Sequence, residues 1–334
     1  MMKYPIGIQT FSNIIQDGYV YVDKTDMVYN LANSGKIFFL SRPRRFGKSL
    51  LLSTLKSYFL GQKELFRGLK IDSLEKEWNV YPVFHLSFGK GIFSMPYELD
   101  KNLETFVAMG EREYGKDELA TTISERFAAV IKAAHIKTGR RAVVLIDEYV
   151  KPLLDVMDQE IFVEDESGNR RKLENYNREL LKGFYGVFKD ADEDLQFVFL
   201  TGVTKFSQVS VFSGFNQPDD ISLDEKYESL CGITKEELLT VFDKPIRSLA
   251  ANKNKSYEDM VAMLTEKYDG YHFSSKMTGI FNPFSILNCF SKNDMRNYWF
   301  ASGTPGYLVR LLAHGNENIN ELVGKYYPAE MFID

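Results

Sequence analysis

Cysteine and histidine are scarce in this sequence of 334 residues, which contains two cysteines and four histidines. The cysteines, Cys231 and Cys289, give neither a disulfide framework nor a metal-binding spacing. The four histidines are scattered and do not have the spacing of a zinc site. The sequence therefore excludes a disulfide-rich secreted scaffold and a zinc-binding module, and it fits a reducing cytoplasm.

Long apolar runs and an excess of positive charge are also absent. No run approaches the roughly 20 apolar residues that span a bilayer, and residues 1–10 lack the apolar core of a signal peptide. The formal net charge of −5 argues against a strongly basic nucleic-acid-binding protein. With 44% hydrophobic and 26% charged residues, we expect a soluble cytoplasmic protein without a membrane partner. Its length predicts two structural units.

The stretch 37–55 has the order strand, glycine turn, Lys-Ser and helix that is typical of a phosphate-binding loop. Residues 37–40 are a short apolar run, which predicts a buried strand. The backbone N–H groups of the turn and the helix N-terminus would form a partly positive concavity for phosphate groups. In this concavity Lys48 would reach the β- and γ-phosphates, and the Ser49 hydroxyl would ligate Mg²⁺.

The loop departs from the regular pattern G-x-x-x-x-G-K-[ST], because Arg42 stands at the first glycine position. The Cβ of Arg42 limits the backbone conformations of the loop. Pro43 fixes its own φ and lacks the backbone N–H that could donate to phosphate. We expect charge to compensate, with three guanidinium groups beside the polyanion. A basic turn that merely precedes a helix is the alternative, but the strand and helix context favours a phosphate loop. The residues of this loop that we predict to contact nucleotide are Arg42, Arg44, Arg45, Phe46, Gly47, Lys48, Ser49 and Leu50.

A second signal is the continuous apolar run 142–146, which ends in Asp147 and Glu148. Such a run is typical of a parallel strand covered on both faces, and ligands bind at the carboxyl ends of such strands. We expect Asp147 to hold Mg²⁺, directly or through water, and Glu148 to orient and polarise the attacking water. Glu148 and Lys48 are thus the predicted catalytic residues. The alternative is a strand that ends in solvated charge, and the phosphate loop upstream favours the functional interpretation.

The rest of the first 231 residues predicts alternating strands and helices. Strands are expected at 19–25, 81–88 and 195–202, and helices at 26–32, 96–114, 117–137 and 174–189. Residues 61–79 predict a connector with two short helical pieces, and 158–172 predict a solvated loop. The strand 195–202 carries Thr201 near its tip. Thr201 and Thr204 lie where nucleoside triphosphate hydrolases carry a γ-phosphate sensor, although a helix cap explains Thr204 equally well.

The pattern changes after Cys231, where strand-like runs disappear. Helices are expected at 234–242, 257–268, 283–290, 305–314 and 318–326. Thr234 is a predicted N-cap that is followed by an acidic first turn. The change predicts a boundary near Cys231, with an α/β domain at 1–231 and a helical domain at 232–334.

These motifs together resemble the bacterial AAA-ATPase-like family, whose members usually carry a C-terminal nuclease domain of the PD-(D/E)XK type. The matching stretches begin at Tyr4 (YPIG), Tyr21 (YVDKT), Ser41 (SRPRRFGKS), Leu145 (LIDEY), Leu200 (LTGVTKFS), Leu230 (LCGIT), Tyr268 (YDGYHF) and Asn282 (NPFS). They span nearly the whole chain, and the form R-P-R-R-F-G-K-S is distinctive. Arginine at the first glycine position is usual in this family.

The resemblance implies an AAA-like P-loop ATPase domain over 1–231, a three-layer α/β sandwich of the additional-strand, catalytic-glutamate type with a mainly parallel sheet. An all-helical lid would follow over 232–334. The resemblance implies that Lys48 binds phosphate and that Ser49 ligates Mg²⁺. It also implies that Asp147 binds the metal and that Glu148 activates the water. The family commonly has Asp where this chain has Val150, so any role of that carboxylate is absent or replaced. No nuclease set of separated Asp and Glu-x-Lys is found, and a fused nuclease would begin beyond Asp334.

These residues predict an ATP-binding, Mg²⁺-dependent ATP-hydrolysing module that drives or gates the lid and a fused or partner effector, such as a nuclease. A nucleotide-gated interaction switch with little turnover is the alternative. Direct nucleic-acid handling is the weaker third interpretation. An arginine supplied by the chain itself or by a neighbouring copy in a homo-oligomer would complete the site. The candidates for this arginine are Arg44, Arg45, Arg247 and Arg310.

Overall fold

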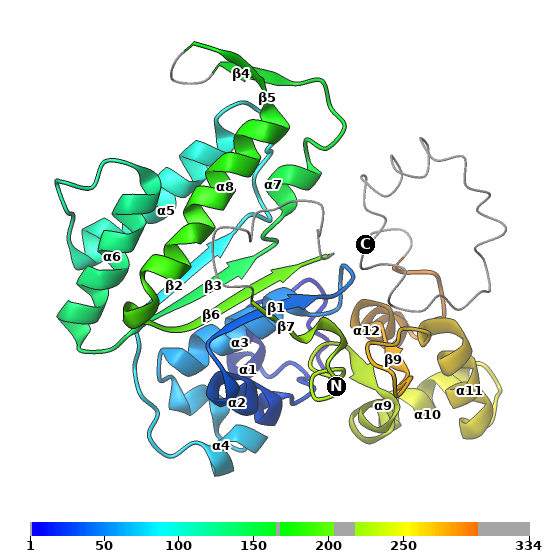
Figure 1. Cartoon of the computed structure of the whole chain (residues 1–334). Coiled ribbons are helices and arrows are strands. Elements are labelled where there is room, and N and C mark those ends of the chain that lie inside the picture. Colours follow the sequence, from blue (N-terminus) through cyan, green and yellow to red (C-terminus); the bar gives the residue numbers. More distant parts are fainter. Residues whose placement is uncertain (1, 165–167, 204–217, 300–334) are drawn as a thin grey trace.

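A parallel β-sheet forms the centre of the computed structural model, which describes residues 2–164, 168–203 and 218–299 (Figure 1). Within these residues the sheet has five strands in the order β2-β3-β6-β1-β7, and every neighbouring pair is parallel. The strands are β1 (Ile37–Ser41), β2 (Val83–Ser87), β3 (Ala142–Asp147), β6 (Leu195–Gly202) and β7 (Asp219–Asp220). Strand β6 thus lies between the strand before the phosphate loop and the strand that ends in the two acids.

The central strands are apolar throughout because both faces of the sheet are covered. In β1, Phe38 and Leu40 belong to the core on one face, whereas Phe39 belongs to the core on the other face. Strands β3 and β6 alternate in the same way, as the two-residue period of a strand requires. The two cores make this part of the chain a three-layer sandwich.

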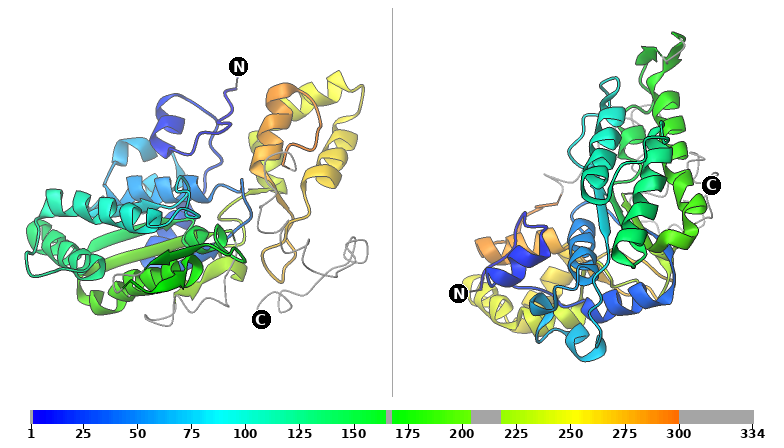
Figure 2. Two further views of the ribbon diagram at one scale, coloured as in Figure 1. Left: turned by 90° about the horizontal axis from the view of Figure 1, so that it is seen from above. Right: turned by 90° about the vertical axis from the view of Figure 1, so that its left-hand side faces the viewer.

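Helices cover both faces of the sheet (Figures 1 and 2). The core on one face is filled from α5 (Glu98–Tyr114), α6 (Ile123–Thr138), α7 (Lys151–Leu154) and α8 (Leu173–Asp190). The core on the other face is filled from α1 (Phe11–Gln16), α2 (Thr25–Ser34), α3 (Lys48–Phe59), η1 (Lys63–Phe66) and α4 (Lys70–Leu74). Phe127 and Phe184 stack with their ring centroids 4.8 Å apart and join α6 to α8. The predicted α/β fold class with a parallel sheet is confirmed.

The remaining part of the described chain is mainly helical and has its own core. Its elements are β8 (Ile233–Thr234), α9 (Lys235–Val241), α10 (Asp243–Asn252), α11 (Tyr257–Tyr268), β9 (Ile280–Phe281) and α12 (Pro283–Lys292). Thr234 and Glu237 form a capping box at the start of α9, as the sequence predicted. The expected helices at 305–314 and 318–326 lie outside the described residues. We propose that the domain boundary lies near Cys231, just before β8.

The structure differs from the predictions in several local features. Residues 19–25 do not form a strand, because Asp23 turns the chain into α2 by accepting the Thr25 N–H at 2.9 Å. The expected loop 158–172 contains an antiparallel hairpin of β4 (Phe162–Glu164) and β5 (Arg170–Lys172). Helix α10 was not predicted. The second unit also contains the antiparallel pair β8 and β9, so it is not entirely helical.

The amino-terminal segment contacts both units. Tyr4, Val20 and Val22 pack against the core of the helical unit. The Lys24 ammonium donates to both carboxylate oxygens of Glu237 at 2.6 Å, which ties the chain before α2 to the first turn of α9. None of the helices in the described ranges is long and apolar enough to cross a bilayer.

The junction between the units requires a glycine. Gly232 has φ +94°, and its N–H donates to the Phe46 carbonyl at 3.2 Å. A Cβ at this position would lie 2.2 Å from Cγ2 of Ile280 on β9. Both the backbone conformation and the close approach of β9 therefore exclude a side chain here.

We expect Gly232→Ala to lower the free energy of unfolding more than Gly139→Ala does, as measured by urea denaturation. Gly139 also has positive φ (+67°), but nothing lies within 4 Å of a Cβ added there. The Gly139 variant therefore reports the left-handed backbone alone, a cost of about 1–2 kcal/mol. The Gly232 variant adds the clash with Ile280. An equal loss of unfolding free energy in the two variants would show that a Cβ at position 232 does not clash with Ile280 of β9.

Candidate active site

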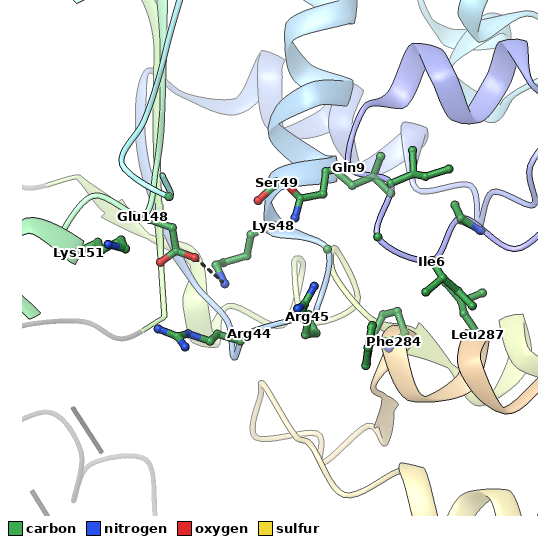
Figure 3. A pocket seen from close by; sticks show the side chains of 17 residues that line it. Ile6, Gln9, Arg44, Arg45, Lys48, Ser49, Glu148, Lys151, Phe284 and Leu287 are labelled. Atoms are coloured by element: carbon green, nitrogen blue, oxygen red, sulfur yellow. Dashed lines mark ion pairs between the residues drawn. The ribbon is translucent and has the colours of Figure 1, made fainter. Parts of the chain in front are cut away.

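A cavity of about 460 Å³ opens at the carboxyl edge of the sheet, beside the N-terminus of α3 (Figure 3). Its wall is made by the phosphate loop, the turn after β3, residues 5–9 and the start of α12. The residues of these segments that line it, together with Gly89, are Pro5, Ile6, Gly7, Ile8, Gln9, Arg44, Arg45, Gly47, Lys48, Ser49, Leu50, Glu148, Lys151, Pro283, Phe284 and Leu287. One end is therefore charged and the other is largely apolar.

The phosphate loop is closed around its lysine. Gly47, the N-cap of α3, has φ +99°, so the turn uses the conformational freedom that glycine provides. The Lys48 side chain is buried, and its ammonium donates to the carbonyls of Arg42 at 3.0 Å and Pro43 at 3.3 Å. The loop therefore wraps the ammonium at the N-terminal end of α3, where the helix dipole favours an anion.

Asp147 ties this loop to the rest of the sheet. Its carboxylate accepts the Ser49 hydroxyl at 2.6 Å and the Thr201 hydroxyl at 2.8 Å. Hydroxyl and carboxylate oxygens are the ligands that Mg²⁺ prefers, and Mg²⁺ takes most of its other ligands from phosphates and water. Within the described ranges, no group of three or more His, Cys, Asp or Glu side chains is arranged to hold a metal. The Ser49 hydroxyl and the Asp147 carboxylate fit Mg²⁺ by the chemistry of their oxygen atoms.

Glu148 points into the cavity from a strained turn. Its φ is +57°, which costs a non-glycine residue about 1–3 kcal/mol. Two contacts of the next residue hold the turn: the Tyr149 N–H donates to the Thr201 carbonyl at 3.0 Å, and the Tyr185 hydroxyl donates to the Tyr149 carbonyl at 2.8 Å. Figure 3 shows the Glu148 carboxylate directed at Lys48, with the charged atoms 3.8 Å apart.

Burial raises the pKa of the Glu148 carboxyl above its ordinary value. The positive charge of Lys48 opposes this shift, and the negative charge of Asp147 adds to it. Burial is the largest of these effects, so the site holds a carboxyl group that accepts a proton more readily than a glutamate in water. A shift in this direction favours a group that accepts a proton.

Comparison with known proteins identifies the family of the chain. The family model described as "Predicted AAA-ATPase" matches residues 5–212. The chain belongs to this AAA-ATPase-like family. A relative from Azotobacter chroococcum mcd 1, described as an uncharacterized protein in the vnfD 5' region, is 39% identical over 314 residues. The match covers 93% of this chain and 56% of the relative, so the chain spans just over half of the relative's length.

Among solved structures, the Aeropyrum pernix Orc1 protein in complex with DNA is similar at a TM-score of 0.35 and 10% sequence identity. This match covers 87% of this chain and 66% of that chain. The resemblance to the AAA-ATPase-like family that the motifs indicated is thus confirmed by the family model, which includes both the phosphate loop and the two acids.

The Arg42 side chain, which we predicted to contact nucleotide, does not line the cavity. Arg42 is 1% exposed, and its guanidinium group donates to the carbonyls of Ser222 at 2.7 Å and Tyr227 at 3.1 Å. It also lies 4.0 Å from the centroid of the Phe273 ring. Burial lowers the pKa of Arg42 to about 10. Arg42 therefore joins the loop to two later segments, and its carbonyl holds Lys48.

Phe46 and Thr201 do not line the large cavity either. The Phe46 ring packs against Tyr271 and Phe273, with centroid distances of 4.6 and 5.5 Å. The Thr201 hydroxyl is buried and committed to Asp147, which explains why it does not line the cavity as the sensor role predicted. Thr204 lies outside the described residues. The other predicted nucleotide-contacting residues, which do line the cavity, are Arg44, Arg45, Gly47, Lys48, Ser49 and Leu50.

The structure adds residues that the sequence reasoning missed. Lys151 lines the charged end of the cavity. Its position three residues after Glu148 was the feature of the sequence that could have indicated this. Phe284 lines the apolar end, where the Arg45 guanidinium lies 4.9 Å from its ring centroid. Val150, at the position where the family commonly has Asp, is buried at the N-cap of α7. A valine side chain cannot cap a helix, so any capping by that carboxylate is absent here.

A second, smaller recess of about 100 Å³ adjoins the apolar end. It shares Pro5, Gly47, Leu50, Pro283 and Leu287 with the large cavity. The rest of its lining is mainly apolar and consists of Val20, Tyr21, Val22, Lys24, Val28, Phe46, Leu51, Thr54, Leu230, Cys231, Gly232, Ile233 and Phe242. The space beside α3 thus runs from Glu148 to an apolar recess between the units.

We expect Arg42→Gly, which restores the regular motif, to destabilise the protein. The change leaves the buried carbonyls of Ser222 and Tyr227 without their donor, at about 1–3 kcal/mol for each. Arg44→Gly is the matched control, because it adds the same backbone freedom in the same loop. Urea denaturation of both variants measures the difference. If the two variants lose equal stability, the buried guanidinium contributes nothing.

We expect Glu148→Gln to raise the free energy of unfolding at pH 7 to 8, because the folded protein disfavours the ionised carboxyl group. The raised pKa means that the stability of the parent protein is fully present below the ordinary glutamate pKa and falls as pH rises through the folded pKa. The gain should therefore vanish below a pH of about 4. Urea denaturation at several pH values tests this. A gain of the same size at every pH would contradict it.

Proposed function

We propose that the chain binds ATP with Mg²⁺ in this cavity and hydrolyses it. The observation that carries the proposal is the convergence of three groups at one edge of the sheet: Lys48 wrapped by its loop, Ser49 bonded to Asp147, and Glu148 directed at Lys48. Family membership already makes the chain an ATPase-type module. The geometry of the cavity supports a role for each of these residues.

The cavity has a direction that fits a nucleoside triphosphate. The charged end contains Lys48, Arg44 and Glu148, which suit the phosphates. The apolar end contains Phe284 and continues into the recess beside Leu51, which suits the base. In this orientation the γ-phosphate lies beside Glu148, and the α- and β-phosphates lie along the N-terminus of α3.

Hydrolysis of ATP depends mainly on positioning and on charge stabilisation. Lys48 would exchange its loop carbonyls for the β- and γ-phosphate oxygens and draw charge from the bond that breaks. Glu148 would orient the water in line with that bond and accept its proton. Ser49 and Asp147 would hold Mg²⁺, and the chemistry that this ion supplies is further positive charge for the phosphates. Tyr149 and Thr201 would keep the two acids in place.

Arginine at the site would stabilise the transition state further. Arg44 and Arg45 line the cavity and are the candidates that the chain itself supplies. Arg247 instead pairs with Asp243 on α10, at 3.0 Å, and Arg310 lies outside the described residues. An arginine from a neighbouring copy in a homo-oligomer would supply the same charge, with a rate gain of about 10³–10⁵.

The nucleotide would act on the helical unit through the wall that α12 provides. Phe284 and Leu287 of α12 line the cavity, and Tyr271 packs on Phe46 of the phosphate loop. We therefore propose that residues 232–334 serve as a lid and that residues 1–231 form the ATPase domain. Nucleotide state would gate an effector, fused or separate, and the family resemblance points to a nuclease.

A nucleotide-gated switch with little turnover is the second candidate. Val150 favours it, because this buried residue stands where the family commonly has Asp, so any role of that carboxylate in turnover is absent. Release of inorganic phosphate at steady state separates the two candidates. A rate at the level of the Lys48→Ala variant, with full ATP binding, would establish the switch and reject the hydrolase.

We expect Lys48→Ala to abolish ATP binding, and Glu148→Gln to bind ATP but fail to turn it over. The lysine contacts phosphate in every state of the reaction, whereas the glutamate acts on the water. Calorimetric titration with ATP and Mg²⁺ measures binding, and phosphate release measures turnover.

Glu118→Gln is the control for Glu148→Gln, because this exposed carboxylate pairs with Lys116 at 2.9 Å, away from the cavity. It should match the parent in both assays. Turnover by Glu148→Gln at the parent rate would show that another group is the base.

A further inference from the structure

Lys151 is held at the charged end of the cavity by contacts that fix its ammonium group. It is the first residue of α7, and its side chain is 21% exposed. Its Nζ donates to the Gly91 carbonyl at 2.7 Å and to the Asp155 carboxylate at 2.5 Å. It also lies 5.0 Å from the centroid of the Phe93 ring. These contacts come from two elements, so the position of the charge is set before any ligand binds.

An ammonium group has three N–H donors, and the two acceptors just named occupy two of them. The Phe93 ring is not a conventional hydrogen-bond acceptor, so the third N–H is left to donate to an anion in the cavity that Lys151 lines. Partial burial of the ammonium group carries a desolvation cost, and the Asp155 carboxylate offsets part of this cost. A fully exposed lysine would not need such a partner. Such preorganised charges act strongly on a reacting group because they do not reorganise during the reaction.

The location distinguishes Lys151 from the other cations of the cavity. Lys48, Arg44 and Arg45 belong to the phosphate loop, whereas Lys151 approaches from the turn that carries the two acids. Figure 3 shows Glu148 between Lys48 and Lys151. The positive charge of Lys151 also lowers the pKa of the Glu148 carboxyl group, which agrees with their proximity. A γ-phosphate beside Glu148 would therefore have a cation on each side.

We propose that Lys151 is a further catalytic residue, whose ammonium group binds the γ-phosphate of ATP and stabilises its charge in the transition state. The proposal rests on the function proposed above. The bond from the water oxygen to the γ-phosphorus forms while the bond to the β–γ bridging oxygen breaks. The water gives a proton to Glu148, ADP leaves with the electron pair of the broken bond, and inorganic phosphate is released. Lys151 then supplies from α7 the charge that arginines supply elsewhere.

This role predicts a specific signature. A group that contacts the γ-phosphate distinguishes ATP from ADP, whereas a group that merely supports the fold affects both alike. We expect Lys151→Met to bind ADP within about twofold of the parent and to lower kcat by about 10²–10³-fold, the effect of removing one preorganised charge donor. It should also fail to trap ADP with aluminium fluoride, which imitates the transferring phosphate. Lys151→Arg should recover part of kcat, because it retains the charge.

The experiment uses the full chain and measures ADP and ATP-analogue binding by calorimetry, with turnover by phosphate release. Lys90→Met is the control, because Lys90 is an exposed lysine on the same loop as Gly91 and does not line the cavity. Thermal unfolding of each variant identifies loss of the fold. A kcat within threefold of the parent, or equal weakening of ADP and ATP-analogue binding, would overturn the role of Lys151.

Failure of the proposed function has a different appearance. If the parent binds ATP without hydrolysing it, the hydrolase is rejected, and the ratio of ATP-analogue to ADP affinity still tests Lys151. A ratio that falls at least tenfold in Lys151→Met supports contact with the γ-phosphate, and an unchanged ratio rejects it. If the parent binds no nucleotide, both proposals fail. A parent that hydrolyses ATP while Lys151→Met does so equally well rejects the role of Lys151 alone.

Discussion

The arrangement of the site depends on the Asp147 carboxylate, which accepts hydroxyl groups from two different segments. Ser49 brings the start of α3 to it, and Thr201 brings the end of β6. Because β6 lies between β1 and β3, the phosphate loop and the acids are separated by one strand, and these two bonds span that strand. A carboxylate with both oxygens occupied has little rotational freedom. It therefore holds the loop and the acidic turn at a fixed separation, which a metal-bound triphosphate requires.

The acidic turn also contains a residue, Glu148, whose conformation and burial lower the stability of the fold. Glu148 has a left-handed backbone and a carboxyl group whose pKa burial raises. Both features lower stability, and both are maintained by the neighbouring Tyr149, which is fully buried and bonded through its backbone to Thr201 and Tyr185. A turn held so firmly directs the carboxylate into the cavity instead of toward solvent. Strain that the surrounding structure overdetermines in this way is typical of functional sites.

The sequence predicted the sheet and the two motifs because each depends on local signals. Continuous apolar runs identify strands that are covered on both faces, and the glycine turn before Lys48 identifies the phosphate loop. What it did not predict depends on contacts between distant segments. The direction of the Arg42 side chain is decided by carbonyls at Ser222 and Tyr227, about 180 residues away along the chain. Lys151 likewise has a role only once its cavity is formed.

Arg42 and Phe46 also explain why the loop tolerates an arginine in place of its first glycine. Neither side chain lines the large cavity, and both pack on Phe273, which belongs to the second unit. The backbone of the loop remains on the side of α3, with its carbonyls on Lys48. A movement of the loop on binding phosphate would therefore displace Phe273 and the segment that leads to β9. With glycine at position 42 the loop would keep only the Phe46 contact with Phe273, so the arginine adds a second packing contact between the loop and the second unit.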